Sequence, residues 1–157
     1  MEERVGKRGT VAGFLSERML RTAGFVSRGN RTADVGCDHA YTSIYLVEQG
    51  IAPQVIAMDV NAGPLARAKE NVKKFGMEEK ISLRLSDGLE ALLPGETDTI
   101  LIGGMGGPLM ERILSAYPAK AAGAKEMALQ PQSEIAEFRR FVQQIGFRIT
   151  EEDMLFE

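Results

Sequence analysis

Short apolar runs alternate with amphipathic segments along this chain of 157 residues. Several runs, such as Val55-Ile56-Ala57-Met58 before Asp59, are continuous and close on an acid or a glycine. Continuous apolar runs of this length are typical of parallel strands that are buried on both faces. We therefore predict strands at residues 32–35, 55–59, 81–85, 99–102 and 127–129.

Segments between these runs carry apolar residues at helical spacing. Before the first strand, Phe14, Leu15, Met19, Leu20 and Phe25 recur with that spacing and predict an N-terminal helix over about 11–26, with arginines on its other face. Gly50, Asn61, Pro108, Ser133 and Gly146 supply start and stop signals. The further helices are expected at 41–50, at 61–75, after 108 and at 133–146.

Strands that alternate with helices imply right-handed crossovers and a mostly parallel sheet with helices on both faces. The predicted fold class is therefore α/β and Rossmann-like, in one domain over residues 1–157, with ligands at the carboxyl ends of the strands. Phe147-Arg148-Ile149 and Met154-Leu155-Phe156 indicate a further strand segment with no return strand after it. We interpret the sequence as truncated at its C-terminus.

Composition and charge narrow the function. Cys37 is the only cysteine and no apolar run approaches the length of a membrane span, which favours a cytoplasmic protein without export or membrane anchoring. The net charge is −3, but residues 1–31 carry seven Lys and Arg against three Glu, so this stretch is +4 and the remainder −7. A basic head suits a nucleic-acid partner, although the charge pattern taken alone is better explained by a solvated amphipathic helix.

The first strand-to-helix turn reads Asp34-Val35-Gly36-Cys37-Asp38-His39-Ala40-Tyr41. A dinucleotide site needs three spaced glycines for a pyrophosphate, and only Gly36 is present. Asp38 would repel that pyrophosphate. S-adenosyl-L-methionine carries an ammonium and a sulfonium instead, which Asp34 and Asp38 complement, so this cofactor is favoured over NAD or FAD.

Two later strand ends fit the same cofactor. Asp59 follows Gly36 by 23 positions, close to the spacing at which an acid accepts hydrogen bonds from ribose hydroxyls. Asp87 could accept from the adenine amino group and Gly88 lets the backbone approach the ring, although a polar turn is an equal alternative.

The fourth predicted strand runs into Gly103-Gly104-Met105-Gly106-Gly107-Pro108. Such glycine density abolishes side-chain bulk at the strand end, which indicates close backbone approach to the methyl group and its acceptor. The alternative is a loop with positive φ angles before a helix that has Pro108 in its first turn.

Together these motifs resemble the bacterial tRNA (adenine-22-N1)-methyltransferase family. The likeness rests on the first turn and the glycine-methionine-glycine-glycine run, and continues through Leu15-Ser16-Glu17-Arg18, Asp87-Gly88-Leu89 and Leu129-Gln130-Pro131. The resemblance implies a class I methyltransferase domain, S-adenosyl-L-methionine as cofactor and methyl transfer to N1 of adenine 22 of tRNA. It also implies a C-terminal helical extension, which we interpret as absent here.

Site residues are assigned on this basis. For cofactor binding we expect Asp34, Gly36, Cys37, Asp38, Asp59, Val60, Asp87, Gly88, Gly103 and Gly104. For the acceptor and catalysis we expect Asp38, His39, Tyr41 and Met105, and for RNA contact Arg18, Arg21 and Gln130. No metal site is expected, because His39 has no accompanying cluster of ligands.

Several alternatives stay open from sequence. His39 is equally a structural hydrogen-bonding residue, Tyr41 a helix-packing residue and Gln130 a loop residue, while Cys37 is better interpreted as a small turn residue than as a nucleophile. The function could also be methylation of a small molecule, or binding of S-adenosyl-L-methionine without catalysis. The sequence does not indicate an oligomeric state.

Overall fold

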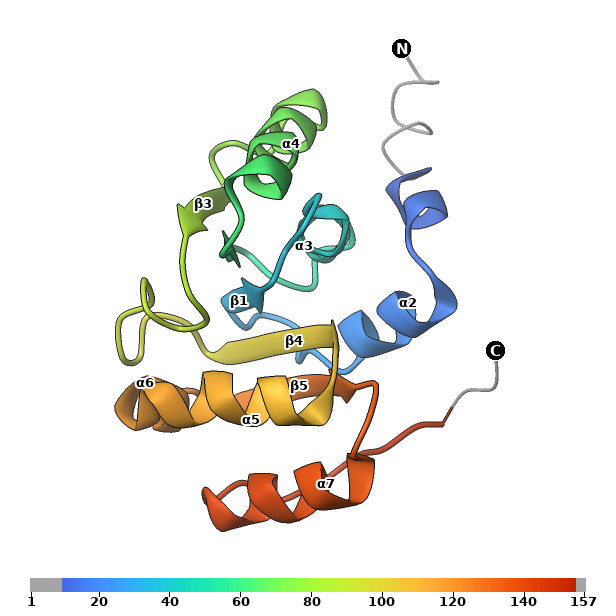
Figure 1. Cartoon of the computed structure of the whole chain (residues 1–157). Helices are drawn as coiled ribbons and strands as arrows, with labels where there is room; N and C mark the ends of the chain where they lie inside the picture. The colour runs from blue at the N-terminus through green and yellow to red at the C-terminus, as the bar shows by residue number, and fades with distance from the viewer. Residues whose placement is uncertain (1–9, 155–157) are drawn as a thin grey trace.

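The computed structural model describes residues 10–154 and contains one five-stranded sheet. All four neighbouring strand pairs are parallel, in the order β3-β2-β1-β4-β5 (Figure 1). The strands are β1 (Thr32–Val35), β2 (Val55–Asp59), β3 (Ile81–Leu85), β4 (Thr99–Met105) and β5 (Glu126–Pro131). The predicted α/β class and parallel sheet are confirmed.

Helices cover both faces of this sheet (Figure 1). One layer contains the 3-10 helix η1 (Thr10–Phe14) with α2 (Glu17–Gly24), α3 (Tyr41–Glu48) and α4 (Ala62–Lys74). The other contains α5 (Gly107–Ala116), α6 (Pro118–Ala122) and α7 (Ile135–Gln144). No helix among the described residues is long and apolar enough to cross a membrane.

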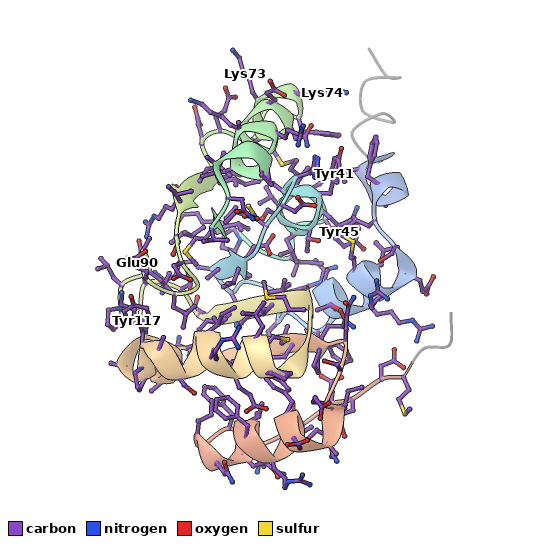
Figure 2. All side chains as sticks on the ribbon, viewed as in Figure 1. Tyr41, Tyr45, Lys73, Lys74, Glu90 and Tyr117 are labelled. Atoms are coloured by element: carbon purple, nitrogen blue, oxygen red, sulfur yellow. The ribbon has the colours of Figure 1, made fainter. Side chains whose placement is uncertain are left out.

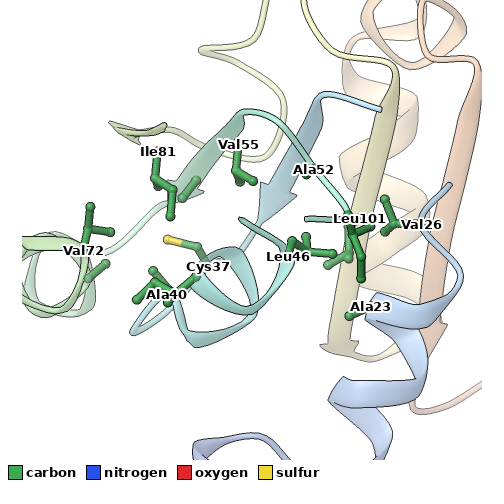
Figure 3. Close-up of a cluster of buried hydrophobic side chains, with 14 of the residues drawn as sticks. Ala23, Val26, Cys37, Ala40, Leu46, Ala52, Val55, Val72, Ile81 and Leu101 are labelled. Carbon is green, nitrogen blue, oxygen red and sulfur yellow. The ribbon is translucent and has the colours of Figure 1, made fainter. Parts of the chain in front are cut away.

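Strands β2, β4 and β5 contribute side chains to two separate cores, because successive residues of a strand point to opposite faces. Within β2, Ala57 belongs to the core under α3 and α4, whereas Met58 belongs to the core under α5 and α7. Figure 3 shows the first of these cores, where Leu46, Val55 and Val72 lie among small side chains. The sheet is therefore packed on both faces, and this packing holds the residues at its carboxyl edge in place.

Polar contacts hold the opposite, amino edge. The Asp98 carboxylate, just before β4, accepts hydrogen bonds from the backbone N–H and the guanidinium of Arg31 at 2.9 and 3.2 Å. These hydrogen bonds lower the pKa of Asp98 to about 2. Glu126 at the start of β5 accepts from Ser27 and Thr99 in the same region. These hydrogen bonds hold the starts of the strands together at the amino edge, whereas the candidate site residues lie at the other, carboxyl edge.

The N-terminal helix differs from its prediction. Instead of one helix over 11–26, η1 ends at Phe14 and α2 begins at Glu17. Ser16 separates them in an extended conformation, and its hydroxyl accepts a hydrogen bond from the backbone N–H of Met19 at 3.2 Å. A serine that caps a helix cannot lie inside one, so the apolar spacing spans two helices.

The C-terminal half shows smaller differences. The short helix α6 was not predicted, and Glu134 rather than Ser133 occupies the N-cap position of α7. Residues 147–154 form neither helix nor strand, so the strand expected at 147–149 is absent from the described residues. Leu155 and Phe156 lie outside them, as do the basic residues Arg4, Lys7 and Arg8.

Candidate functional site

The Asp59 carboxylate joins the first two strand ends. It lies at the end of β2, is buried, and accepts backbone N–H groups on both oxygens: Asp38 donates to Oδ2 and Asn61 to Oδ1, each at 2.9 Å. The Asp59 carbonyl accepts in turn from Ser86 after β3 at 2.9 Å. A carboxylate has about four acceptor positions, so Asp59 keeps capacity for two further donors.

A second acid lies deeper in the same place. Asp34 is on β1, buried, and its Oδ2 accepts a 2.6 Å hydrogen bond from the Ser43 hydroxyl on α3. Burial raises the pKa of Asp34 to about 6, the Asp59 charge adds to this rise, and the Ser43 hydrogen bond opposes it. Two acids so close in a partly dehydrated place favour a positively charged ligand group near them.

Gly36 leaves space where β1 meets β4. Its φ is +75°, and a Cβ atom built on it would lie 2.5 Å from the Met105 Cε atom. The Gly36 and Cys37 N–H groups both donate to the Met58 carbonyl at 2.8 Å. Met105 therefore fills the space over this turn, which places it beside the predicted cofactor residues.

Cys37 is buried in the apolar core below the turn (Figure 3). Burial, with the negative charges of Asp34 and Asp59 as further causes, raises the pKa of the Cys37 thiol far above its usual range. A thiol that stays protonated is a poor nucleophile. Its burial favours the interpretation of Cys37 as a small turn residue over that of a nucleophile.

Beyond Gly36 the turn has an unusual backbone. Asp38 and Ala40 have positive φ angles of 53° and 65°, so the chain coils tightly before α3 begins. The His39 Nδ1 atom lies 3.0 Å from the Asp38 carboxylate, and the His39 carbonyl accepts a 2.9 Å hydrogen bond from Asn71 on α4. The Asp38 carboxylate remains largely exposed, with its side chain 68% accessible.

Three aromatic rings lie parallel beside this turn. The Phe14 and Tyr41 ring centroids are 4.7 Å apart with 10° between their planes, and those of Tyr41 and His39 are 5.7 Å apart with 4° between them. Tyr41 is the first residue of α3, and Figure 2 labels it between α3 and η1. The N-terminal segment is thus attached to the predicted acceptor residues.

The turn after β3 is closed by its own side chains. The Ser86 hydroxyl donates to the Gly88 carbonyl at 2.8 Å and accepts from the Ala91 N–H at 3.0 Å. Gly88 has a φ of +62°, and a Cβ atom there would lie 3.2 Å from Ile113 on α5. Asp87 is exposed, so its carboxylate is accessible to a ligand at the carboxyl edge.

Strand β4 continues into the glycine run as far as Met105, whereas the sequence predicted that this strand ends at residue 102. Gly104 has a φ of +76°, and its N–H donates to the Gln130 Oε1 atom of β5 at 2.9 Å. Gly107 donates to the Ser133 carbonyl at 3.0 Å, and a Cβ atom on Gly107 would lie 2.6 Å from that oxygen. The glycines thus let β4 and α5 approach the segment after β5.

The two predicted RNA-binding arginines lie together on α2. The Arg21 guanidinium contacts Glu17 at 3.2 Å and Asp153 at 2.5 Å. Such exposed ion pairs contribute little free energy and exchange readily for another anion. The Arg18 backbone carbonyl accepts from Thr22 at 2.8 Å.

Most of the predicted residues converge on one edge. Direct contacts join the ends of β1, β2, β3, β4 and β5 through Asp38–Asp59, Asp59–Ser86, Gly36–Met105 and Gly104–Gln130. Val60 follows Asp59 there with an exposed side chain. The Arg21 guanidinium contacts Glu17 and Asp153 and is not part of these four contacts. Sequence reasoning missed Ser43, Asn71 and the stacking role of Phe14, because each acts on a residue distant in sequence.

The chain is similar to known methyltransferases along most of its length. A family model described as a methyltransferase domain matches residues 15–157. The tRNA (adenine(22)-N(1))-methyltransferase of Bacillus subtilis is 37% identical over 143 residues, which are 91% of this chain and 60% of that protein.

Solved structures agree. The crystal structure of the B. subtilis m1A22 tRNA methyltransferase TrmK superposes with a TM-score of 0.86 at 38% identity, covering 91% of this chain and 61% of that one. The structure of Streptococcus pneumoniae Sp1610 in complex with S-adenosyl-L-methionine gives a TM-score of 0.87 at 41% identity, covering 91% and 67%. The chain therefore spans about 60% of the length of the curated relative.

Proposed function

This chain belongs to the methyltransferase-domain family, and on that premise we propose that it transfers a methyl group from S-adenosyl-L-methionine to N1 of adenine 22 in tRNA. The observation that carries the proposal is the acidic carboxyl edge, where Asp34, Asp38 and Asp59 lie around the glycine turn at Gly36 that Met105 covers. The similarity to the B. subtilis tRNA methyltransferase over 91% of this chain supports the same substrate. A tRNA substrate implies a cytoplasmic protein.

The residues present fit this cofactor. The buried acid Asp34 and the exposed acid Asp38 suit its positive groups, and the spare acceptor positions of Asp59 suit two ribose hydroxyls. Val60 and Asp87 offer an apolar surface and an acceptor for the adenine ring, and Gly88 contributes a backbone without a side chain in the turn after β3. Gly36 and Cys37, with Gly103 and Gly104, complete the backbone walls of the proposed pocket.

When bound, S-adenosyl-L-methionine supplies an electrophilic methyl group on a sulfonium sulfur. Adenine N1 has an in-plane lone pair, so the protein has no proton to remove before attack. It needs to unpair the base, align N1 with the methyl carbon and exclude water. Met105, which covers the turn at Gly36, is the apolar side chain we assign to that last task.

The methylated ring is a cation, which an acceptor at the acceptor site stabilises. The Asp38 carboxylate is exposed and fixed by its contact with His39 at 3.0 Å. We assign charge stabilisation to Asp38 and orientation of the base to His39 and, through hydrogen bonding, to Tyr41. Gln130, held by the Gly104 N–H, offers its amide nitrogen to the RNA, and Arg18 and Arg21 contact phosphates.

The test is transfer of labelled methyl from S-adenosyl-L-methionine to unmethylated tRNA, with digestion to nucleosides and their identification. We expect N1-methyladenosine at position 22, lost in Asp38→Ala and retained in Glu151→Ala, which removes an exposed acid outside the site. A tRNA that carries guanine at position 22 is the substrate control. Cofactor binding measured by calorimetry separates loss of the cofactor from loss of chemistry.

Two other functions predict different results. A small-molecule methyltransferase would bind the cofactor, leave tRNA unmethylated and turn over in a metabolite extract. A binding domain without catalysis would bind the cofactor and would transfer labelled methyl neither to tRNA nor to any compound in the metabolite extract. Cofactor binding without labelled tRNA therefore contradicts the tRNA proposal, and absence of cofactor binding contradicts all three.

A further inference from the structure

Phe14 presents an aromatic ring to solvent at an unusual place. Its side chain is 55% exposed although it is large and apolar. One such residue is common on any surface, but this ring is also the outer member of the parallel set formed with Tyr41 and His39. The set connects the exposed ring to the turn that carries Asp38.

The same contacts change the role expected of Tyr41. From the sequence, Tyr41 was expected among the residues that contact the acceptor base. In the structure its ring lies parallel to Phe14 at 4.7 Å and to His39 at 5.7 Å, and it packs partly buried against the core. Its ring surface is largely used within the protein. A stacking surface for a ligand is therefore better provided by Phe14, the most exposed of the three rings.

Local sequence and charge indicate the kind of ligand. Gly13, next to Phe14, has no side chain and a Cβ atom built there would meet nothing within 4 Å, so the surface beside Phe14 is not crowded. Two residues later Ser16 caps α2, which carries Arg18 and Arg21. Aromatic surface combined with neighbouring cations is the arrangement by which proteins hold unpaired nucleotides: the ring stacks on a base and the cations contact phosphates.

We propose that Phe14 stacks on an unpaired base of the RNA substrate, extending the parallel set of rings outward from the site. This inference rests on the proposed function, because it takes the substrate to be RNA, but it concerns binding and not methyl transfer. Because the Phe14 ring is already exposed, a base can stack on it without any unfolding of the protein. It adds to the site a base-binding residue that lies outside the cofactor pocket.

The chain contains no tryptophan, so Phe14→Trp introduces a single fluorescent reporter at this position. Titration with an oligoadenylate should quench its emission, because stacking on a base quenches indole. An abasic ribose-phosphate oligomer of the same length and charge should not. Equal quenching by both oligomers, or none by either, overturns the proposal.

Affinity provides the second measurement. Phe14→Ala should weaken binding of the oligoadenylate about tenfold, the lower range for loss of one base–aromatic stack. Phe14→Leu keeps an apolar contact for Tyr41 and should weaken it nearly as much. Leu93→Ala, which truncates another exposed apolar side chain between β3 and β4, should leave it unchanged.

A merely structural role for Phe14 predicts another pattern, in which Phe14→Leu binds RNA as tightly as the wild type. Stacking also predicts that Phe14→Ala shifts affinity equally at low and high salt, since no phosphate contact is lost. The result is independent of methyl transfer. Quenching without methylation would leave this inference standing and refute the proposed function, whereas methylation with unchanged RNA affinity in Phe14→Ala would do the reverse.

Discussion

The Met105 terminal methyl lies 2.5 Å from the position of a Cβ atom on Gly36, and so the end of β4 closes over the first turn of the sheet. Gly36→Ala should therefore act twice. The φ of +75° costs an alanine about 1–2 kcal/mol of folding stability. The new methyl group also displaces the Met105 side chain into the proposed pocket, and cofactor affinity should fall about tenfold, equivalent to ~1.4 kcal/mol.

Gly76→Ala is the matched control, because Gly76 has a φ of +70° and open space around it. Both variants should lose similar stability in denaturant titrations, and only Gly36→Ala should lose cofactor affinity in calorimetry. Adding Met105→Ala to Gly36→Ala should restore part of that affinity. Similar cofactor affinity in both single variants would show that Met105 does not limit the pocket.

This contact marks a boundary of sequence-based prediction. The glycine at position 36 and the glycine run at 103–107 are both visible in the sequence, and strand order places both at the carboxyl edge. Nothing in a one-dimensional pattern indicates that Met105 folds back over Gly36. That contact depends on the irregular pairing of β4 and β5 between Gly103 and Met105, which only the three-dimensional register shows.

The buried acid Asp34 gives a prediction about pH. Its pKa is raised to about 6 from an ordinary value of 3.8, so the folded state binds its proton more tightly than the unfolded state. Its contribution to stability is therefore greatest below pH 4 and decreases as pH rises to about 6, by about 2–3 kcal/mol. Asp34→Asn keeps a partner for Ser43 and should remove this decrease, as measured by urea unfolding from about pH 2 to about pH 8.

Asp98→Asn provides the comparison of opposite sign. The Asp98 pKa is lowered to about 2, so its contribution is present above pH 4 and lost as pH falls towards 2. The difference between wild type and Asp34→Asn should change between pH 4 and 6, and that between wild type and Asp98→Asn below pH 4. A constant difference for Asp34→Asn across pH 4–8 would mean that Asp34 ionises with its ordinary pKa.

The N-terminal segment shows a second boundary. Apolar spacing predicted one helix over about 11–26, which is correct for the helical segments up to residue 14 and from 17 to 24, but it missed the break at Ser16, although serine is a common cap. Apolar spacing indicates which face of a helical segment is buried, and it carries no signal for an interruption between two consecutive helical segments such as η1 and α2. The stacking of Phe14 on Tyr41 was not predictable either, since the two residues are 27 positions apart and meet only because η1 packs against α3.

The arginines on α2 test whether the basic head contacts RNA. Arg18→Ala with Arg21→Ala should flatten the slope of log binding constant against log salt by about 1.4, if each arginine neutralises one phosphate of a single-stranded segment at ~0.7 per contact. The Arg21 ion pairs with Glu17 and Asp153 do not prevent this, because exposed pairs of that kind are weak. The measurement is filter binding of tRNA between 50 and 300 mM salt, concentrations at which screening varies strongly.

Lys73→Ala with Lys74→Ala removes the same charge from the last turn of α4, which Figure 2 shows at the far end of that helix, and should leave the slope unchanged. Equal flattening by both pairs would mean that the arginines act only through net charge, and an unchanged slope in the arginine pair would exclude them from the RNA contact.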